Sequence, residues 1–341
     1  MDIRTKQKEN CPLCETEGDY LHRDLKERLF FNCHGYSWNI RVCKNMTCRH
    51  MWIDPSPIKE DLHKLYTEYY THDLKISIGP LKKFYQEIIE QYFCVMFNYP
   101  SRKRGTTKWI WPLLYFFPWR LPLLNRKIMY LPYVKDGRLL EIGFGNGERL
   151  GLLSSLGWQA IGVDFDQTSV NNGLREGLRV SLGDVTEQKY PDDYFDAIIS
   201  SHVIEHIPDP KAWLDECMRI LKPGGRLICT TPNNRSLGHS LFERNWRDLD
   251  PPRHLHIFSP ASLCSLITSE KTRCTTSKVG ASTLFDSYWL YKGYDPIVKK
   301  NQLNKFAYLL IFEALHIFEW ISSAVFRVTG EELVFLVVKQ R

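Results

Sequence analysis

The stretch Arg138-Leu-Leu-Glu-Ile-Gly-Phe-Gly-Asn-Gly147 decides the fold class of this chain of 341 residues. Its first five residues form a short apolar run typical of a buried strand, and its glycines predict a tight turn. A helical pattern follows from Glu148 to Leu156. A strand, a glycine-rich turn and a helix in this order predict the first unit of a doubly wound α/β sheet, where backbone N–H groups of the turn can approach a bound nucleotide.

Further short apolar runs alternate with helical patterns, as expected of βαβ units that build a parallel sheet. We predict strands at residues 138–142, 160–163, 178–182, 195–199, 226–230 and 332–338. The predicted fold is therefore a Rossmann-like, doubly wound α/β sheet, preceded by a small cysteine-rich module.

Composition divides the chain into three zones: a cysteine-rich head (1–54), a helical and aromatic connector (55–135) and the α/β domain (136–341). Within the last zone we expect an insertion at about 235–328 that caps the substrate. The net charge of +6 is not gathered into runs, so charge alone does not indicate nucleic acid. No apolar segment follows the basic start, which predicts a cytoplasmic protein.

The head contains two close cysteine pairs, Cys11 with Cys14 and Cys43 with Cys48. Two such pairs separated by a β-like stretch are typical of two knuckles that close one tetrahedral zinc site, and a four-thiolate site is structural because no coordination position stays open. The wider second pair leaves open that Cys33 with His34, or His50, replaces one ligand. Four buried free cysteines are the less favoured alternative.

The spacing of the glycine-rich turn distinguishes between cofactors. A dinucleotide site needs a third glycine or alanine where this chain has Glu148. Glu141, two residues before the first glycine, would repel a pyrophosphate but suits a cofactor with a cationic amino-acid end, such as S-adenosylmethionine. Asp164 follows the second strand, where a carboxylate holds ribose hydroxyls in nucleotide-binding α/β folds.

The motifs in order resemble those of the class I methyltransferases, from Leu140-Glu-Ile-Gly-Phe-Gly-Asn-Gly147 through Gly162-Val-Asp164, Gly183-Asp184, Phe195-Asp196 and His202-Val-Ile-Glu-His206 to Leu221-Lys-Pro-Gly-Gly225. The resemblance implies that S-adenosylmethionine binds to Glu141, Gly143, Gly145, Gly147, Asp164, Phe165, Asp184, Val185 and Ser201. Among these, the first four would line its methionine end, Asp164 its ribose, and Asp184 with Val185 its adenine. It also implies an antiparallel last strand.

The order of zinc ribbon, connector and methyltransferase domain resembles bacterial methyltransferases associated with surface polysaccharides and secondary-metabolite sugars. The chain is also similar to sugar C-methyltransferases, which are longer, and to ubiquinone-pathway O-methyltransferases. We therefore expect methyl transfer to an oxygen or carbon of a small molecule or of a glycan precursor.

His202, Glu205 and His206 follow the fourth strand of the α/β domain, at the sheet edge where substrate should enter. A histidine there is a natural base for methyl transfer. The pattern also matches an inverted zinc-protease motif, against which its position in a nucleotide-binding fold argues. Ubiquinone-pathway O-methyltransferases carry a similar Glu-His pair that serves a divalent metal, with an acid in place of His202. A structural role for Glu205 and His206 is an equal alternative.

A second histidine segment, Trp246 to Ser259, follows the fifth strand and would place His254 and His256 on one face if extended. The zinc-ribbon methyltransferases carry a Pro-Arg-His segment here, and His254 is the matching position. We predict that His254 is the general base or orients the acceptor, with Arg253 or Trp246 shaping the acceptor site. The alternative is a loop histidine that anchors Asp250.

Other functions and partners are expected less. A non-methylating enzyme of the same fold or a non-catalytic cofactor-binding protein remains open. A nucleic-acid methyltransferase ranks lower, because Ser200-Ser-His-Val stands where an Asn-Pro-Pro-Tyr tetrapeptide would follow the fourth strand.

Residues 109–131 and 306–328 are apolar enough for peripheral membrane contact, but prolines interrupt the first segment. The polar residues of the second segment fall on one helical side, so packing of its apolar face onto the domain is favoured.

Overall fold

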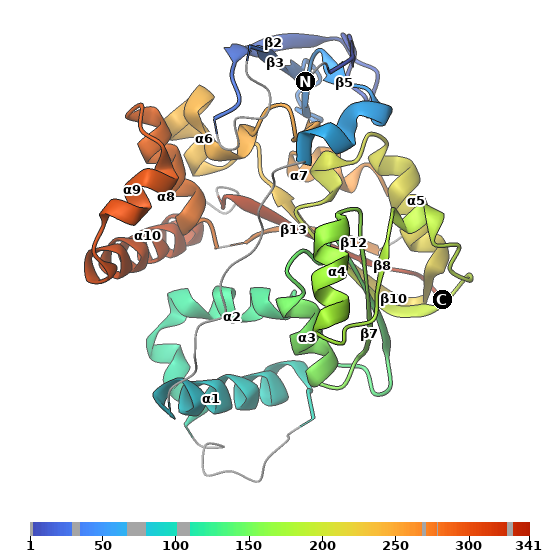
Figure 1. Cartoon of the computed structure of the whole chain (residues 1–341), viewed down its shortest axis with the longest axis vertical. Coiled ribbons are helices and arrows are strands. Elements are labelled where there is room, and N and C mark those ends of the chain that lie inside the picture. The colour runs from blue at the N-terminus through green and yellow to red at the C-terminus, as the bar shows by residue number, and fades with distance from the viewer. Residues whose placement is uncertain are drawn as a thin grey trace. The chain divides into compact units, whose positions relative to one another are not determined.

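The computed structural model of the chain describes residues 3–28, 35–66, 80–100, 110–267, 271–277, 279–325 and 330–341 (Figure 1). The chain divides into two compact units. The first comprises Met1–Tyr69, Ser201–Asp215 and Cys229–Val337, and the second comprises Tyr70–Ser200, Glu216–Ile228 and Val338–Arg341. The predicted boundaries at residues 54 and 135, and the capping insertion at about 235–328, rest on composition and resemblance and stay predictions.

One seven-stranded sheet has the order β12-β13-β10-β9-β6-β7-β8. Its strands are β6 (Arg138–Ile142), β7 (Gln159–Asp164), β8 (Val180–Leu182), β9 (Phe195–Ser201), β10 (Leu221–Pro232), β12 (Lys271–Ser277) and β13 (Glu332–Val338). β6 pairs in parallel with β7 and with β9, and β7 pairs in parallel with β8. The predicted doubly wound α/β fold is confirmed, and the strand expected at 178–182 is shorter, because it begins at Val180.

The last strand, β13, lies between β10 and β12. The Gly224 N–H donates to the Lys339 carbonyl (2.8 Å), and the Asn233 N–H donates to the Glu331 carbonyl (2.9 Å). The later residue of β10 therefore pairs with the earlier residue of β13, so these strands run in opposite directions. This confirms the predicted antiparallel last strand.

Helices of the second unit lie before and between the strands that it contains. They are α1 (Pro80–Phe97), α2 (Leu121–Lys127), α3 (Glu148–Ser155) and α4 (Gln167–Arg175), with 3₁₀ turns η3 (Trp111–Phe116), η4 (Pro118–Arg120) and η5 (Val185–Glu187). The Asp166 carboxylate starts α4 by accepting from the N–H groups of Thr168 and Ser169. Leu150 and Leu153 of α3 are buried. α5 (Pro210–Ile220) follows β9 in the chain.

The cysteine-rich head belongs to the first unit. Its elements are β1 (Thr5–Lys6), β2 (Gly18–Leu25), β3 (Trp38–Cys43) and β4 (Met51–Ile53), and the start of the connector adds β5 (Ser56–Pro57) and η1 (Lys59–Tyr66). A four-stranded sheet has the order β11-β4-β3-β2, so β11 (His256–Ile257) completes it. Trp246, Leu249 and Leu255 share the core of this sheet with Trp38 and Ile40. The sequence did not predict that a segment 200 residues away in the chain would supply part of this core.

The remaining helices of the first unit gather beside one another in Figure 1, apart from α7. They are α6 (Leu237–Phe242), α7 (Pro260–Cys264), α8 (Ala281–Tyr291), α9 (Pro296–Gln302) and α10 (Lys305–Val325), with η6 (Ile204–His206), η7 (Glu243–Asn245) and η8 (Arg247–Leu249). α10 packs onto α8 as expected, with the ring centroids of Phe312 and Phe285 5.6 Å apart, but the expected outward direction of its polar side is wrong. Glu319 and Ser323 point inward and are buried, because the Glu319 carboxylate accepts from the Gly280 N–H (2.6 Å).

Candidate functional site

The glycine-rich turn after β6 adopts a backbone that side chains disfavour. Gly143, Gly145 and Gly147 have φ angles of 72°, 55° and 73°, in the left-handed region. A Cβ atom on Gly145 would meet nothing within 4 Å, whereas one on Gly147 would lie 2.7 Å from Leu178 Cδ1. Gly147 is therefore required by conformation and by close packing, and Gly145 by conformation beside open space, where a ligand can approach the backbone.

Glu141 is the last residue but one of β6, the strand that leads into this turn. Its side chain is buried, and Arg149 Nη1 donates to Oε1 (3.1 Å), while Oε2 is buried without a hydrogen-bond partner. Burial raises the pKa of Glu141 to about 7 against the opposing charge of Arg149. An unpaired buried carboxylate oxygen is costly unless a ligand satisfies it. A cationic ammonium group would do so, and it would also favour the ionised carboxylate.

Asp164 ends β7 and connects the second strand to the turn. Its Oδ2 accepts from the Gly145 N–H (2.9 Å), and its Oδ1 accepts from the Asp166 N–H (3.0 Å). Burial raises the pKa of Asp164. The next residue, Phe165, is 51% exposed. A fixed carboxylate beside an exposed ring suits a ribose and a flat base.

The other predicted cofactor residues lie in different surroundings. The Asp184 carboxylate accepts from the Thr186 N–H and hydroxyl (2.9 and 2.7 Å) at the start of η5. Val185 is fully buried, so any contact with a cofactor would come from its backbone. Ser201, assigned to the first unit, accepts from the Thr230 hydroxyl at 3.4 Å. Their roles in cofactor binding stay predictions.

The four predicted zinc ligands gather in the head. One ligand atom from each of Cys11, Cys14, Cys43 and Cys48 lies within 4.8 Å of the others, and the Sγ atoms are 3.9 Å apart in the pair Cys11–Cys48 and 3.4 Å apart in Cys14–Cys43. Zn–S bonds of about 2.3 Å in a tetrahedron place sulfur atoms roughly 3.8 Å apart. The geometry and the donor set therefore fit zinc.

The alternative ligands are not part of this group. His50 is buried, and its Nε2 lies 3.0 Å from His256 Nδ1. Burial, together with the charge of His256, lowers the pKa of His50 well below its usual range, so the ring is neutral. Cys33 and His34 lie outside the described residues.

A second group of ligand-type side chains comes from η6 and the segment after η8. Ligand atoms of Glu205, His206 and His254 lie within 4.8 Å of one another. His206 Nδ1 is 2.9 Å from the Arg253 carbonyl, and His254 Nδ1 is 2.7 Å from the Asp248 carbonyl. A carbonyl oxygen only accepts, so the proton of each neutral ring is on Nδ1 and the lone pair is on Nε2. We call these residues the histidine group; it could bind a proton or a metal ion.

The electrostatics favour a neutral His206 beside an ionised Glu205. Burial, reinforced by the charge of His254, lowers the pKa of His206 to about 4. Burial alone would raise the pKa of Glu205, but the hydrogen bond and charge of His202 lower it to about 2. The Thr231 hydroxyl donates to Glu205 Oε2 (2.9 Å).

His202 is bonded through both ring nitrogens. Its Nδ1 lies 3.2 Å from Glu205 Oε1 and its Nε2 lies 2.8 Å from Glu332 Oε2, while its backbone has a φ of 54°. Burial opposes its charge, but these hydrogen bonds outweigh it and raise the pKa of His202 to about 9. A cationic ring held by two carboxylates suits a positioning role, and the predicted catalytic role of His202 stays a prediction.

The second histidine segment is extended only at β11, so His254 and His256 do not share a site. His254 is next to His206, with ring centroids 4.9 Å apart, whereas His256 bonds to His50. Arg253 is buried and pairs with Glu27 and Asp250. Trp246 is buried, and its indole N–H donates to Glu331 (2.8 Å). Both side chains support the segment from within, and the expected role of Arg253 or Trp246 in shaping the acceptor site stays a prediction.

Two supporting residues were missed at the sequence level. Glu332 holds His202, and Asp248 fixes the tautomer of His254 through its backbone carbonyl. Glu332 is the first residue of an apolar strand, and an acid in that position was the available signal. No sequence signal marks a backbone carbonyl as a partner.

Comparison with known proteins identifies the domain type. Residues 118–269 match the family model described as a methyltransferase domain. A Mycolicibacterium smegmatis protein named as an S-adenosylmethionine-dependent methyltransferase is 34% identical over 97 residues, which is 28% of this chain and 38% of that protein. A ubiquinone biosynthesis O-methyltransferase of Cereibacter sphaeroides is 29% identical over 164 residues, 43% of this chain and 66% of that protein.

Among solved structures, a methyltransferase from Archaeoglobus fulgidus has 20% identity and a TM-score of 0.42, with 67% of this chain and 100% of that chain covered. The chain thus spans 38% and 66% of the lengths of the two curated relatives that it matches.

Proposed function

This chain carries a class I S-adenosylmethionine-dependent methyltransferase domain, and from that premise we propose that it methylates an oxygen or carbon atom of a small molecule or glycan precursor. The observation that carries the proposal is the turn after β6, where left-handed glycines adjoin the unpaired Oε2 of Glu141 and the fixed carboxylate of Asp164. This donor set suits an amino acid joined to a nucleoside.

Several residues of the second unit would hold the cofactor, which supplies an electrophilic methyl group when bound. Glu141 Oε2 would accept from the ammonium group, which satisfies its unpaired oxygen. Asp164, fixed by the Gly145 N–H, would accept from the ribose hydroxyls. Phe165 would stack against the purine.

The acceptor needs a base if its nucleophile is a hydroxyl or a carbon acid. We assign that role to His254, whose proton on Nδ1 leaves the Nε2 lone pair for the acceptor. When His254 takes a proton, Glu205 stabilises the resulting charge, as does Asp250, whose Oδ2 is 4.0 Å from Nε2. His202 orients Glu205 and is a positioning residue in this proposal.

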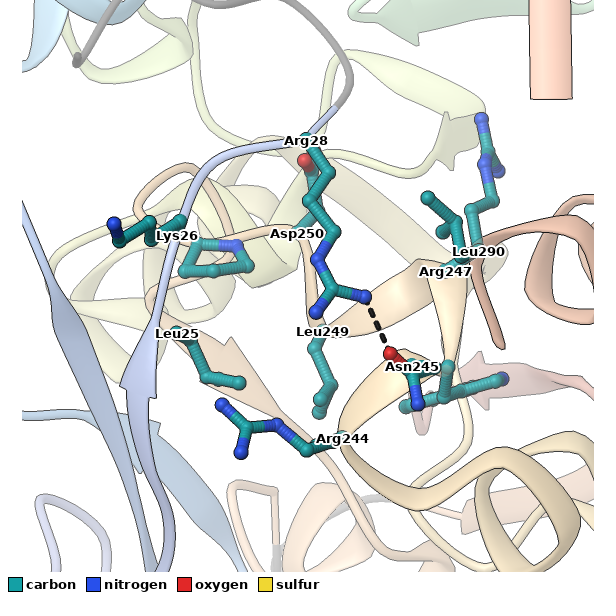
Figure 2. Close-up of a pocket in the computed structure, with 11 residues that line it drawn as sticks. Leu25, Lys26, Arg28, Arg244, Asn245, Arg247, Leu249, Asp250 and Leu290 are labelled. Atoms are coloured by element: carbon teal, nitrogen blue, oxygen red, sulfur yellow. Dashed lines mark hydrogen bonds between the residues drawn. The ribbon is translucent and has the colours of Figure 1, made fainter. Parts of the chain in front are cut away.

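A small hollow of the first unit, about 20 Å³ or room for about one water molecule, is lined by basic side chains that could hold an anionic group at its mouth. Its lining includes four basic residues, Lys26, Arg28, Arg244 and Arg247, and one carboxylate, Asp250. Figure 2 shows Arg28 lining this hollow, donating to Asn245 (2.5 Å). Burial, together with the charge of Arg244, lowers the pKa of Arg28.

Two arginines of this hollow, Arg28 and Arg244, lack compensating negative charge. Asp250 is engaged by Arg253, and Arg247 pairs with Asp248 and Asp286. Within the described part of the chain, neither Arg28 nor Arg244 forms an ion pair. Guanidinium groups bind phosphate in two-pronged geometry. A sugar or glycan precursor that carries phosphate is therefore the acceptor we propose.

The head contributes structure in this proposal. The four thiolates would hold one zinc ion and leave no open position. The Trp52 side chain packs in the same buried cluster, and Ser259 Oγ donates to the Cys48 carbonyl (2.6 Å). Zinc would thus fix the segment that ends in Ser259 as well as the head itself.

The test is titration calorimetry with S-adenosylmethionine and S-adenosylhomocysteine, followed by assay of adenosylhomocysteine release. We expect micromolar binding by the parent and loss of binding in Asp164→Ala, with Asp215→Ala as the control because Asp215 is an exposed carboxylate of α5. Release should require a phosphorylated sugar and weaken in Arg28→Gln. Binding without release on any acceptor would favour a non-catalytic protein, and no binding by folded protein would overturn the proposal.

A further inference from the structure

The outer face of α10 is apolar along its whole length. The described residues of α10 that are exposed are Phe306, Leu309, Leu310, Ala314, Phe318, Ile321 and Val325. Phe306 is 72% exposed and Val325 is 65% exposed. A surface helix of a soluble domain normally turns its polar side outward. α10 does the opposite, and the proposed methyl transfer does not use its exposed apolar stripe.

Buried polar contacts hold α10 in this orientation. Glu319 Oε2 accepts from the Gly280 N–H at the start of α8 (2.6 Å), and the Ser323 hydroxyl donates to the Glu319 carbonyl (2.6 Å). Burial raises the pKa of Glu319 to about 8, so the side chain is largely neutral at pH 7. Rotation of α10 that buried the apolar stripe would break these contacts and expose the polar groups to solvent.

An apolar cavity adjoins the inner edge of this helix. It has a volume of about 220 Å³ and is lined by side chains of α6, α8 and α10 only. They are Leu241, Phe242, Leu284, Phe285, Tyr288, Trp289, Ile311, Leu315 and Phe318. Phe318 and Leu241 are also exposed, so the cavity reaches the surface at the apolar stripe. Apolar cavities stay free of water and take apolar ligands, such as part of a hydrocarbon chain.

Positive charge and aromatic rings border the stripe. Residues 288–310 contain four lysines and one aspartate. Lys299 Nζ lies 4.1 Å from the centre of the Tyr294 ring, and Lys300 Nζ lies 5.5 Å from that of Tyr308 on α10. Exposed apolar residues flanked by aromatic rings and lysines are the pattern of segments that lie in a membrane interface.

We propose that the layer formed by α8, α9 and α10 docks on an anionic lipid bilayer, with the apolar stripe in the interface and an acyl chain entering the apolar cavity. A second copy of the chain is the less suitable occupant, because a symmetric contact would bring its lysines against those of the first copy. By length and composition alone, Phe306–Ser323 could cross a membrane, and 17% of it is buried here. The hydrogen bond between Glu319 and Gly280 instead keeps α10 against α8, so α10 would lie parallel to the membrane surface.

The test is flotation of the full chain with vesicles of phosphatidylcholine that contain one quarter phosphatidylglycerol. We expect binding to these vesicles and little to pure phosphatidylcholine. Lys299→Gln with Lys300→Gln should bind about thirtyfold more weakly, which corresponds to about 2 kcal/mol at about 1 kcal/mol per lysine. Phe306→Ser with Leu310→Ser should lose binding at every lipid composition. Met46→Ser, which removes an exposed apolar side chain of the head, is the matched control.

Three results would overturn the docking proposal. They are no flotation of the parent, equal flotation of the Phe306→Ser/Leu310→Ser variant, and a parent that is dimeric in solution with a monomeric variant. Cofactor titration of the same variants separates this proposal from the methyltransferase assignment, because both variants should bind S-adenosylmethionine as the parent does.

Discussion

The described residues of the first unit contain two groups of side chains that could hold a metal ion, and the two groups differ in ligand type, ligand number and surroundings. The cysteine group has four ligands of one kind, three of them buried, and no neighbouring acid or base within it. The histidine group has three ligands of two kinds, each oriented by a further hydrogen bond: Glu205 accepts from Thr231, and His206 and His254 donate to the carbonyls of Arg253 and Asp248. Four thiolates complete a tetrahedron, whereas two imidazoles and a carboxylate leave a position open.

The difference teaches how one folded unit separates stability from reactivity. A closed site has nothing left to offer a substrate, so its binding energy goes into folding. An open group whose rings are fixed by backbone carbonyls keeps two Nε2 lone pairs available. We therefore expect changes in the cysteine group to act on stability alone, and changes in the histidine group to act on turnover.

The largest effect is expected from Cys43→Ser. Structural zinc contributes about 10–16 kcal/mol in small zinc modules, which is comparable to the whole stability of a domain. The variant should lose zinc, and the first unit should unfold at ordinary temperature, as measured by metal content and circular dichroism. Cys264→Ser, which changes a half-buried cysteine outside the group, is the control. A Cys43→Ser protein that melts like the parent would remove the proposed structural role.

Glu205→Gln should have the next largest effect. It removes the buried partner of the ion pair with His202, whose side chain is 38% exposed, so solvent screening keeps the loss of unfolding free energy to about 2 kcal/mol. It also removes the charge that stabilises protonated His254. The free energy of unfolding, measured in urea, and the rate of turnover should both fall, the rate by about 100-fold. Glu332→Gln is the matched control, because it also pairs with His202 but lies outside the histidine group. Equal losses of turnover in both variants would contradict the proposal that the histidine group, and not its neighbours, acts in catalysis.

The stability of the parent should depend on pH through His202. Its folded pKa of about 9 is above the value of about 6.5 in the unfolded chain, so its contribution is complete below pH 6.5 and is lost as pH rises through 9. The side chain is 38% exposed, so solvent screening reduces this contribution to about 2 kcal/mol. Urea unfolding from pH 6 to 10 should show a steeper loss in the parent than in His202→Gln. Parallel profiles would show that His202 is not charged.

The smallest effect is expected from Ser259→Ala. Its hydroxyl donates to the Cys48 carbonyl and accepts from the Ser262 N–H at the start of α7. Loss of these bonds should lower the unfolding free energy by about 1 kcal/mol and leave turnover unchanged. A fall in turnover without a change in melting temperature would mean that the second cysteine pair affects catalysis directly.

The fold could be predicted where local physics decides it. The turn after β6 needs left-handed residues at positions 143, 145 and 147, and glycine there is readable without a structure. The cysteine pairs were equally readable, because their spacing already brings two ligands together. Strand β13 was predicted from its apolar run, and its antiparallel direction came from the family resemblance.

The histidine group could be predicted only in part, because its members are 48 residues apart and meet through a turn that no local pattern defines. That turn brings His254 to His206 and sends His256 to His50. The orientation of α10 was mistaken for a similar reason. Glu319 and Ser323 of its polar side are buried, and the Glu319 carboxylate accepts from the Gly280 N–H, a tertiary contact that a helical wheel does not contain.

The most direct test of the central claim is to measure cofactor affinity, thermal unfolding and methyl transfer on one preparation of His254→Gln. The account predicts parent-like affinity for S-adenosylmethionine, a full complement of zinc, a melting temperature within a few degrees of the parent and methyl transfer reduced by about 10²–10⁴-fold. Methyl transfer at the parent rate would contradict the claim, because the histidine group would then be structural like the cysteine group.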